Sequence, residues 1–297
     1  MKKLLMVFLS VYLFGQAKID TSRKIPVFDL SKGFNIPGLI PNNIPTAEKI
    51  QLLPNEIDEI KQKAKAFIPE PVTNDDIVVM ATSRGTMKLK LFPDIAPNHC
   101  NNFKKLANST FYDGTTFHRI IPGFMIQGGD INSRDNNPKN DGQGGPGWQV
   151  DAEFNKVPHK RGILSMARSN DPNSAGSQFF ICVADAPHLD GKYTAFGEVI
   201  ENLYVVDHIV KTPTEYMQAT RMSKESIPKG EDPDNWITLR DPKTGKKLYS
   251  KVPQYMKKVD YEYDMRNKIK SDRPALPLTI KKIRVTVQSE NQKTQVE

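Results

Sequence analysis

The chain is divided into short apolar runs, each followed by glycine, proline, asparagine or aspartate, and this punctuation constrains its fold most. Short runs with turn residues between them are typical of antiparallel β-strands. The runs cover 77–82, 87–91, 117–121, 125–127, 162–167, 178–184, 193–199 and 278–287. Two further segments, 97–107 and 202–210, are expected to be helices. We therefore predict a mainly β fold, a closed antiparallel barrel with two helices.

The stretch Phe117–Asp130, FHRIIPGFMIQGGD, is predicted to form a β-hairpin around which the fold is organised. If Ile121 pairs with Met125 across a three-residue loop, Arg119 lies directly opposite Gln127. Opposed residues share one face of a hairpin, with Cβ atoms about 5 Å apart. An arginine in an apolar strand is more often a snorkelling core residue than a functional one. The hairpin alone therefore assigns no role to Arg119.

The N-terminus has the pattern of a secretory signal peptide over residues 1–17. Two lysines precede an apolar stretch over 4–14, and small residues flank a cleavage site at 15–17. The stretch is shorter than the roughly 20 residues needed to span a bilayer. We expect an exported protein, periplasmic or extracellular. An uncleaved N-terminal segment that tethers the protein to a membrane is the alternative.

Residues 18–74 are predicted to form a proline-rich leader with one helix over 55–67. Proline recurs through this segment, which favours extended chain. The apolar stripe of the helix, which includes Ile57, Ile60 and Ala64, is expected to dock on the main domain. The main domain is predicted to cover 75–289, with a polar tail over 290–297.

Residues 211–276 interrupt the predicted domain. They are polar and punctuated by proline, with a small hairpin expected around 241–245 and a helix within 254–270. The strand expected at 278–287 follows them and is needed to complete the barrel. We therefore interpret 211–276 as an insertion, because loops tolerate long insertions at modest entropic cost.

Composition excludes several classes of function. The formal net charge is +8, but lysine and arginine are dispersed, so we predict no nucleic-acid partner. The five histidines and two cysteines show no metal-ligand spacing, so no metal is expected. Cys100 and Cys182 are expected to be buried free thiols, although an exported protein could join them.

Three blocks of sequence resemble those of a known family. FHRIIPGFMIQGGD, GILSMARSNDPNSAGSQFFICVA and LDGKYTAFGEV are similar to the signature blocks of the cyclophilins, the peptidyl-prolyl cis-trans isomerases. The resemblance covers about 76–210 and the final strand, and leaves out the leader and the insertion. It implies an eight-stranded antiparallel barrel capped by two helices.

The resemblance also implies an active-site face. The catalytic role falls on Arg119, with Gln127 facing it. An apolar pocket for the proline ring would be formed by Phe124, Met125, Phe180 and Leu189. The remaining substrate-binding positions are His118, Ala167, Arg168, Gln178, His188 and Tyr193. The backbone at Ala167 and Arg168 is expected to pair with an extended substrate.

Two positions depart from the best-known members of the family. His188 stands where a tryptophan precedes the Leu-Asp-Gly turn, and Tyr193 stands where a histidine follows Gly-Lys. The second change resembles the bacterial branch. Loss of the indole at His188 implies weak binding of the inhibitor cyclosporin.

The implied reaction is rotation about an X-Pro peptide bond, whose barrier is about 18–20 kcal/mol. In the twisted state the prolyl nitrogen regains a lone pair, and a permanent cation such as Arg119 can donate a hydrogen bond to it. No bond is broken, so we predict no cofactor. The expected partners are proline-containing polypeptides, and the protein is expected to be a monomer.

Two alternatives to an exported folding isomerase stay open. A binding or chaperone module could use the same groove without turnover. A structural surface protein could retain an inactive barrel of this kind. The presence of Arg119 favours the enzyme, and an assay on an X-Pro peptide would separate these possibilities.

Overall fold

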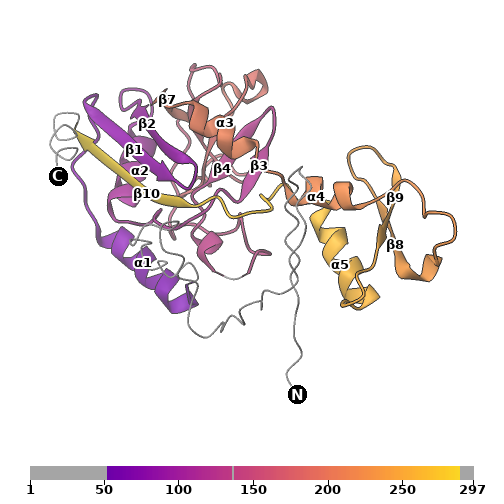
Figure 1. The fold of residues 1–297 in the computed structure, drawn as a ribbon. Coiled ribbons are helices and arrows are strands. Elements are labelled where there is room, and N and C mark those ends of the chain that lie inside the picture. Colours follow the sequence, from indigo (N-terminus) through magenta and orange to yellow (C-terminus); the bar gives the residue numbers. More distant parts are fainter. Residues whose placement is uncertain (1–51, 136, 288–297) are drawn as a thin grey trace, which may run out of the picture. The chain divides into compact units, whose positions relative to one another are not determined.

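The computed structural model describes residues 52–135 and 137–287, and its largest element is an eight-stranded antiparallel sheet (Figure 1). The strands run in the order β10-β1-β2-β7-β5-β6-β4-β3. Their bounds are β1 Asp76–Thr82, β2 Gly85–Leu91, β3 Arg119–Ile121, β4 Met125–Gly128, β5 Ile163–Met166, β6 Phe179–Cys182, β7 Ala195–Glu201 and β10 Ile280–Val287. Each apolar run predicted to be a strand overlaps one of these strands, although β1, β2, β4 and β7 extend beyond the predicted bounds.

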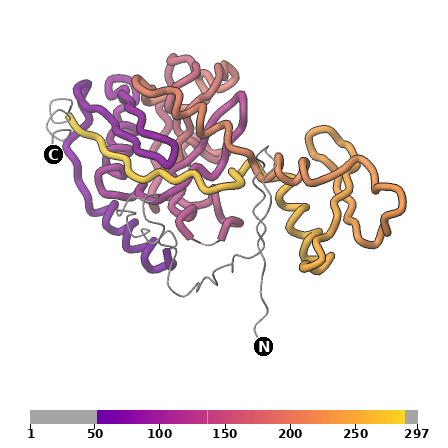
Figure 2. Tube along the Cα trace, in the orientation of Figure 1, coloured from indigo at the N-terminus to yellow at the C-terminus, as the bar shows by residue number. Residues whose placement is uncertain are grey.

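The last strand returns to the first across most of the sequence. β10 pairs with β1 along its length, from Asp76 opposite Val287 to Thr82 opposite Ile280. Figure 2 shows the yellow end of the chain beside the indigo strand β1. The interpretation that a long insertion separates this strand from the rest of the sheet is consistent with this pairing.

The prediction of a closed barrel is wrong, because the sheet is curled but open. Its two edge strands, β3 and β10, do not pair with each other. The residues that precede β3 are joined instead to the start of β10 and to the residues before it, by hydrogen bonds such as Ile280 N to Thr115 O at 2.7 Å and Phe117 N to Leu278 O at 2.9 Å. The physical reason is that β3 has only three residues and the backbone on its free side is already hydrogen-bonded to another segment, so β10 cannot pair with it. The Ile120 N–H donates to the Asp272 carbonyl at 2.9 Å.

Helices cover the main core. α2 (Pro97–Asn108) packs against β7 and β10, and α3 (Tyr204–Val210) packs against β2, β3 and β4. α1 (Pro54–Ala66) places Ile57 and Ala64 in the same hydrophobic core, as its apolar stripe predicted. Short 3-10 turns lie at η2 (Ile131–Arg134), η3 (Pro187–Leu189) and η4 (Pro233–Asn235).

The segment between α3 and β10 contains four further elements. It contains α4 (Glu215–Met222), the antiparallel pair β8 (Trp236–Arg240) and β9 (Lys247–Lys251), and α5 (Lys258–Lys268), which lie together in Figure 1. The hairpin and the helix α5 were predicted, whereas α4 was missed. These elements share a hydrophobic core of their own, separate from that of the large sheet.

Several predictions fall outside the described residues or stay untested. The signal peptide over 1–17 and the tail over 290–297 lie outside the described part of the chain. The domain boundaries stay predictions.

Cys100 and Cys182 are buried and free, and burial raises the pKa of each thiol to about 12. Among the described helices, none combines the length and apolar character that crossing a membrane requires.

Candidate functional site

The hairpin of β3 and β4 has the predicted register. Ile121 lies opposite Met125, and Arg119 lies opposite Gln127. The loop between the strands turns at Gly123, whose φ of +76° favours glycine. The number of loop residues therefore fixes which side chains share a face, because side chains alternate along each strand.

An apolar cluster separate from the main core lies beside this hairpin. Pairing of β4 with β6 sets Gln127 opposite Phe180 and Met125 opposite Cys182. Alternation sends the intervening Ile126 and Ile181 to the main core instead. The cluster contains Met125, Phe180, Cys182, Ala186 and Leu189, with Ile121, Phe124, Ala167 and Tyr193 packed against it. The structure thus brings together all four residues predicted for a proline pocket.

Arg119 lies on the edge strand with a half-exposed side chain. Its side chain is 48% exposed, so the guanidinium is open to a ligand. Its Nε lies 3.6 Å from Oδ2 of Asp272, a residue that follows α5. Among the described residues, no hydrogen bond joins Arg119 to Gln127. The predicted pair shares a face, and its members have other partners.

Gln127 and Gln178 form a fixed pair of amides. Gln127 Nε2 donates to Gln178 Oε1 at 3.0 Å. Gln178 Nε2 in turn donates to the carbonyl oxygens of Gly142 and Gly144, each at 2.9 Å. These contacts are those of a structural hydrogen-bonding residue, and they orient the Gln127 carboxamide.

The wall opposite the hairpin carries the residues that depart from the best-known family pattern. The His188 ring lies 5.4 Å from that of Phe124, and the Tyr193 ring lies 5.9 Å from that of Phe180. The Arg168 guanidinium lies 4.5 Å above the Tyr193 ring and donates to the Lys192 carbonyl at 3.0 Å. Arg168 therefore covers the Tyr193 ring and holds it against the apolar cluster.

Of the two backbone N–H groups at Ala167 and Arg168, one is occupied and the other is available to a substrate. The Ala167 N–H donates to the Gln178 carbonyl at 3.0 Å, so this group is occupied. Within the described chain, no hydrogen bond uses the Arg168 N–H. The predicted pairing with an extended substrate therefore has the Arg168 N–H as its available donor.

His118 lies behind Arg119 and is only 6% exposed. Neither ring nitrogen has a well-formed hydrogen bond within the described residues. Burial lowers the pKa of His118, and the nearby carboxylate of Asp130 opposes this shift. The imidazole is therefore favoured in its neutral form, and it lines a cavity that also reaches Arg119 and Gln127.

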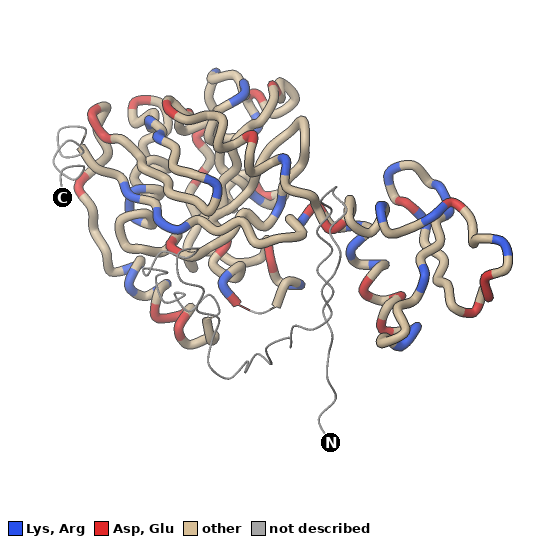
Figure 3. The backbone as a smooth tube through the Cα atoms, in the orientation of Figure 1, with Lys and Arg blue, Asp and Glu red and all other residues tan. Residues whose placement is uncertain are grey.

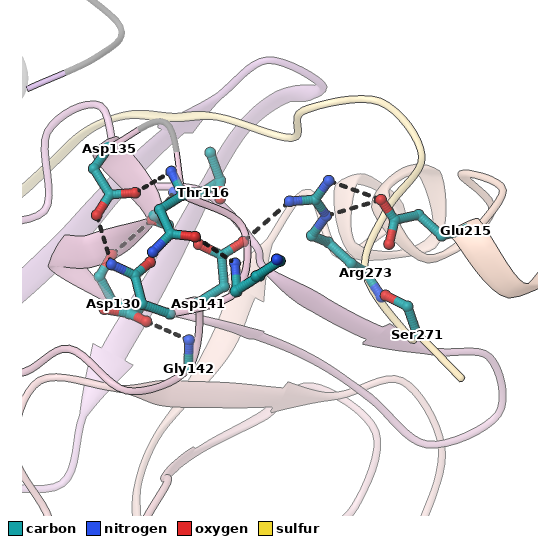
Figure 4. A network of polar contacts seen from close by, with 12 residues as sticks. Thr116, Asp130, Asp135, Asp141, Gly142, Glu215, Ser271 and Arg273 are labelled. Carbon is teal, nitrogen blue, oxygen red and sulfur yellow. Dashed lines mark hydrogen bonds and ion pairs between the residues drawn. The ribbon is translucent and has the colours of Figure 1, made fainter. Parts of the chain in front are cut away.

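Residues of the insertion also lie beside the site, and no sequence pattern predicted them. Arg273 donates to Glu215 at 2.7 Å and lies 3.5 Å from Asp141 of the loop that follows β4 (Figure 4). Asp130 accepts a hydrogen bond from the N–H of Gly142, the residue after Asp141, in the same network. Local patterns could not find these contacts, because the partners are far apart in sequence.

Known proteins are similar to the sheet-forming part of the chain. The sequence model of the family described as cyclophilin type peptidyl-prolyl cis-trans isomerase/CLD matches residues 77–228. A Synechococcus elongatus protein named peptidyl-prolyl cis-trans isomerase is 49% identical over 120 residues, 40% of this chain and 77% of the relative. A Brucella suis protein named probable peptidyl-prolyl cis-trans isomerase is 40% identical over 174 residues, 54% of this chain and 86% of the relative.

One solved structure is also similar. The crystal structure of a cyclophilin type peptidyl-prolyl cis-trans isomerase from Cryptosporidium parvum covers 71% of this chain and 97% of its own. The two chains are 28% identical, with a TM-score of 0.49.

Proposed function

The chain belongs to the cyclophilin-type peptidyl-prolyl cis-trans isomerases and is an enzyme of that class, and from this premise we propose that it assists the folding of exported proteins. One observation carries the proposed site. A buried apolar cluster adjoins a half-exposed arginine on the same hairpin. An X-Pro bond needs this combination: a surface that holds the proline ring and a donor beside the prolyl nitrogen.

In the proposed mechanism the proline ring enters the cluster around Phe124, Met125 and Phe180. Arg119 is the catalytic residue, and its guanidinium donates to the prolyl nitrogen as the amide twists and the lone pair localises. That hydrogen bond is stronger in the twisted state than in the planar one, so it lowers the barrier. Gln127, oriented by Gln178, binds the substrate backbone.

The wall around His188 is proposed to weaken cyclosporin binding. His188 packs on Phe124 with a smaller ring than the indole found in sensitive relatives of the family. The other substrate contacts proposed are the Arg168 N–H, the Tyr193 ring and Leu189. His118 supports this face from behind Arg119.

Location and partners are proposed from the sequence. The signal-peptide pattern over 1–17 supports export, with a retained membrane tether as the alternative. Lys and Arg are interspersed with Asp and Glu along the described chain (Figure 3), which agrees with a protein partner rather than a nucleic acid. We propose that the protein is a monomer. We also propose that it needs no metal or cofactor, because the reaction breaks no bond.

The test is a protease-coupled assay with an X-Pro peptide on the protein that begins at residue 18. We expect Arg119→Ala to lower kcat/KM more than tenfold, which corresponds to about 1.4 kcal/mol in the barrier. Arg161→Ala is the matched control. Its side chain is 41% exposed and pairs with Asp207 away from the site, so its activity should match the wild type.

Two outcomes would contradict the proposal. Unchanged turnover in a folded Arg119→Ala protein would exclude the proposed mechanism. Peptide binding by the wild type without any turnover would instead support the chaperone alternative.

A further inference from the structure

A cavity of about 910 Å³ lies between the catalytic hairpin and the insertion. His118, Arg119 and Gln127 line one side of it, and residues of α5 such as Tyr263 and Asn267 line the other. The loop around Asp141 forms a third side. The volume is in the upper part of the range for pockets that enclose a ligand. The cavity is continuous with the proposed catalytic residues, because Arg119 and Gln127 belong to both.

The insertion wall is held firmly against the hairpin. The segment after α5 adds to the free edge of β3 through the hydrogen bond from Ile120 N to Asp272 O. The next residue, Arg273, binds Glu215 and lies 3.5 Å from Asp141. Backbone and side-chain contacts therefore join the wall to both the strand and the loop. These contacts hold the insertion side of the cavity beside the hairpin.

Most of the lining residues carry polar or charged side chains, which suits a polypeptide better than an apolar ligand. Lys139 Nζ donates to the Tyr263 hydroxyl at 2.8 Å and lies 4.9 Å from the centre of its ring. The Tyr263 ring is 56% exposed, and the Asn267 side chain is also exposed on the same helix. Exposed amide, hydroxyl and ring groups can bind backbone and side chains of an extended chain.

On the basis of the isomerase function proposed above, we propose that this cavity is a subsite for the substrate residues that flank the proline. The proline ring occupies the apolar cluster, and the chain continues past Arg119 between the hairpin and α5. The insertion thereby selects long, unfolded polypeptides over short peptides. The occupant is a polypeptide because the cavity opens directly onto the residues that act on the X-Pro bond.

The experiment compares two peptides that share one X-Pro core. The short peptide ends one residue after proline, and the long peptide extends by about four residues on each side. We expect the wild type to show a kcat/KM at least fivefold higher for the long peptide. Absence of that preference would overturn the proposal.

Two variants of α5 test the wall, and each has a matched control. Asn267→Trp places a bulky ring in the cavity, and Tyr263→Ala removes a lining ring. We expect each to reduce the ratio of long-peptide to short-peptide kcat/KM to less than half its wild-type value, chiefly through KM. The controls are Asp260→Trp, exposed on the same helix, and Tyr255→Ala, whose side chain is 88% exposed. Neither residue lines the cavity.

The outcomes separate this proposal from the function on which it rests. If both wall variants keep the wild-type ratio while Arg119→Ala loses activity, the subsite is excluded and the isomerase function stands. If the wild type isomerises neither peptide, the proposed function is wrong, and the subsite proposal that rests on it is wrong too. An equal fall of the ratio in the controls would also overturn the subsite, because residues outside the cavity would then have the same effect as residues that line it.

Discussion

At the scale of single residues, the orientation of each polar side chain in the site is set by its hydrogen-bond or ion-pair partner. Gln127 and Arg119 face each other across the hairpin, yet the Gln127 amide binds Gln178 and the Arg119 guanidinium lies near Asp272. A shared face therefore brings two side chains together without making them partners. The contacts that orient them come from loops distant in sequence.

Asp141 provides a pH-dependent contact at the edge of the site. Its side chain is 16% exposed, and burial raises its pKa to about 6, against the opposing effect of Arg273. The ordinary value is near 3.9. The folded protein therefore binds this proton more tightly than the unfolded chain. The stabilising contribution of Asp141 is complete below about pH 4 and is lost as the pH rises through about 6.

We expect the free energy of unfolding of the wild type to fall relative to that of Asp141→Asn between pH 4 and pH 7. Asparagine does not titrate, so the difference between the two proteins isolates this carboxyl group. The shift should be at least about 1 kcal/mol, since one pKa unit corresponds to about 1.4 kcal/mol. Urea unfolding at several pH values measures it. A difference that stays constant across this range would contradict the prediction.

At the scale of elements, β3 is a short edge strand that the insertion covers. Exposed strand edges invite pairing with other chains, and covering them is one way in which proteins avoid it. Here the Asp272 carbonyl accepts from Ile120 N, and the carboxylate of the same residue lies 3.6 Å from Arg119 Nε. We therefore propose that Asp272, which covers the edge, also restrains the guanidinium and acts as a positioning residue.

We expect Asp272→Asn to lower kcat about three- to tenfold with little change in KM. Asparagine keeps the backbone bond but loses the charge, so Arg119 samples more rotamers, and fixing such a side chain costs about 0.5–1.5 kcal/mol. The exposed ion pair itself contributes at most about 1 kcal/mol to stability, so the fold should persist. Steady-state kinetics measures the split between kcat and KM.

The matched control is Glu225→Gln, which removes a carboxylate of the same insertion that pairs with Lys246. Its kinetics should equal those of the wild type. Asp272→Glu should restore part of the lost kcat. A folded Asp272→Asn protein with an unchanged or higher kcat would show that Asp272 does not position Arg119.

At the scale of the whole molecule, the insertion is built around a hydrophobic core of its own. The core of the insertion includes Ile237, Leu239 and Met265, and it is separate from the core under the large sheet. The two ends of the insertion meet, since Ala275 N donates to Pro213 O at 2.9 Å. A unit of this kind can be removed without opening the main core.

We expect replacement of 214–274 by a short Gly-Ser linker to leave the main domain folded. Its thermal midpoint should change by less than about 8 °C, because the loss of edge contacts costs on the order of 1 kcal/mol. Near-ultraviolet circular dichroism during heating measures this change. Loss of the near-ultraviolet signal at room temperature would show instead that the two cores fold as one.

The sequence by itself determined the features of this protein that depend on residues close together in the chain. Turn residues and apolar runs located the strands, and loop length set the register of Arg119 against Gln127. The family resemblance implied the four pocket residues that the apolar cluster brings together. These features depend on neighbours a few residues apart, whose geometry the backbone restricts directly. The resemblance to the cyclophilin blocks indicated the class of reaction. It could be recognised from the sequence because each block is a continuous segment.

Only the tertiary structure decided the rest. It left the sheet open at β3, paired the Gln127 side chain with that of Gln178, and brought Asp272 and α5 beside the hairpin of β3 and β4. Each of these contacts joins residues that are far apart in sequence. Their pairing depends on how two cores pack and on which unpaired backbone group reaches a free partner. No periodicity within a single segment carries that information, so it appears only when the chain is folded.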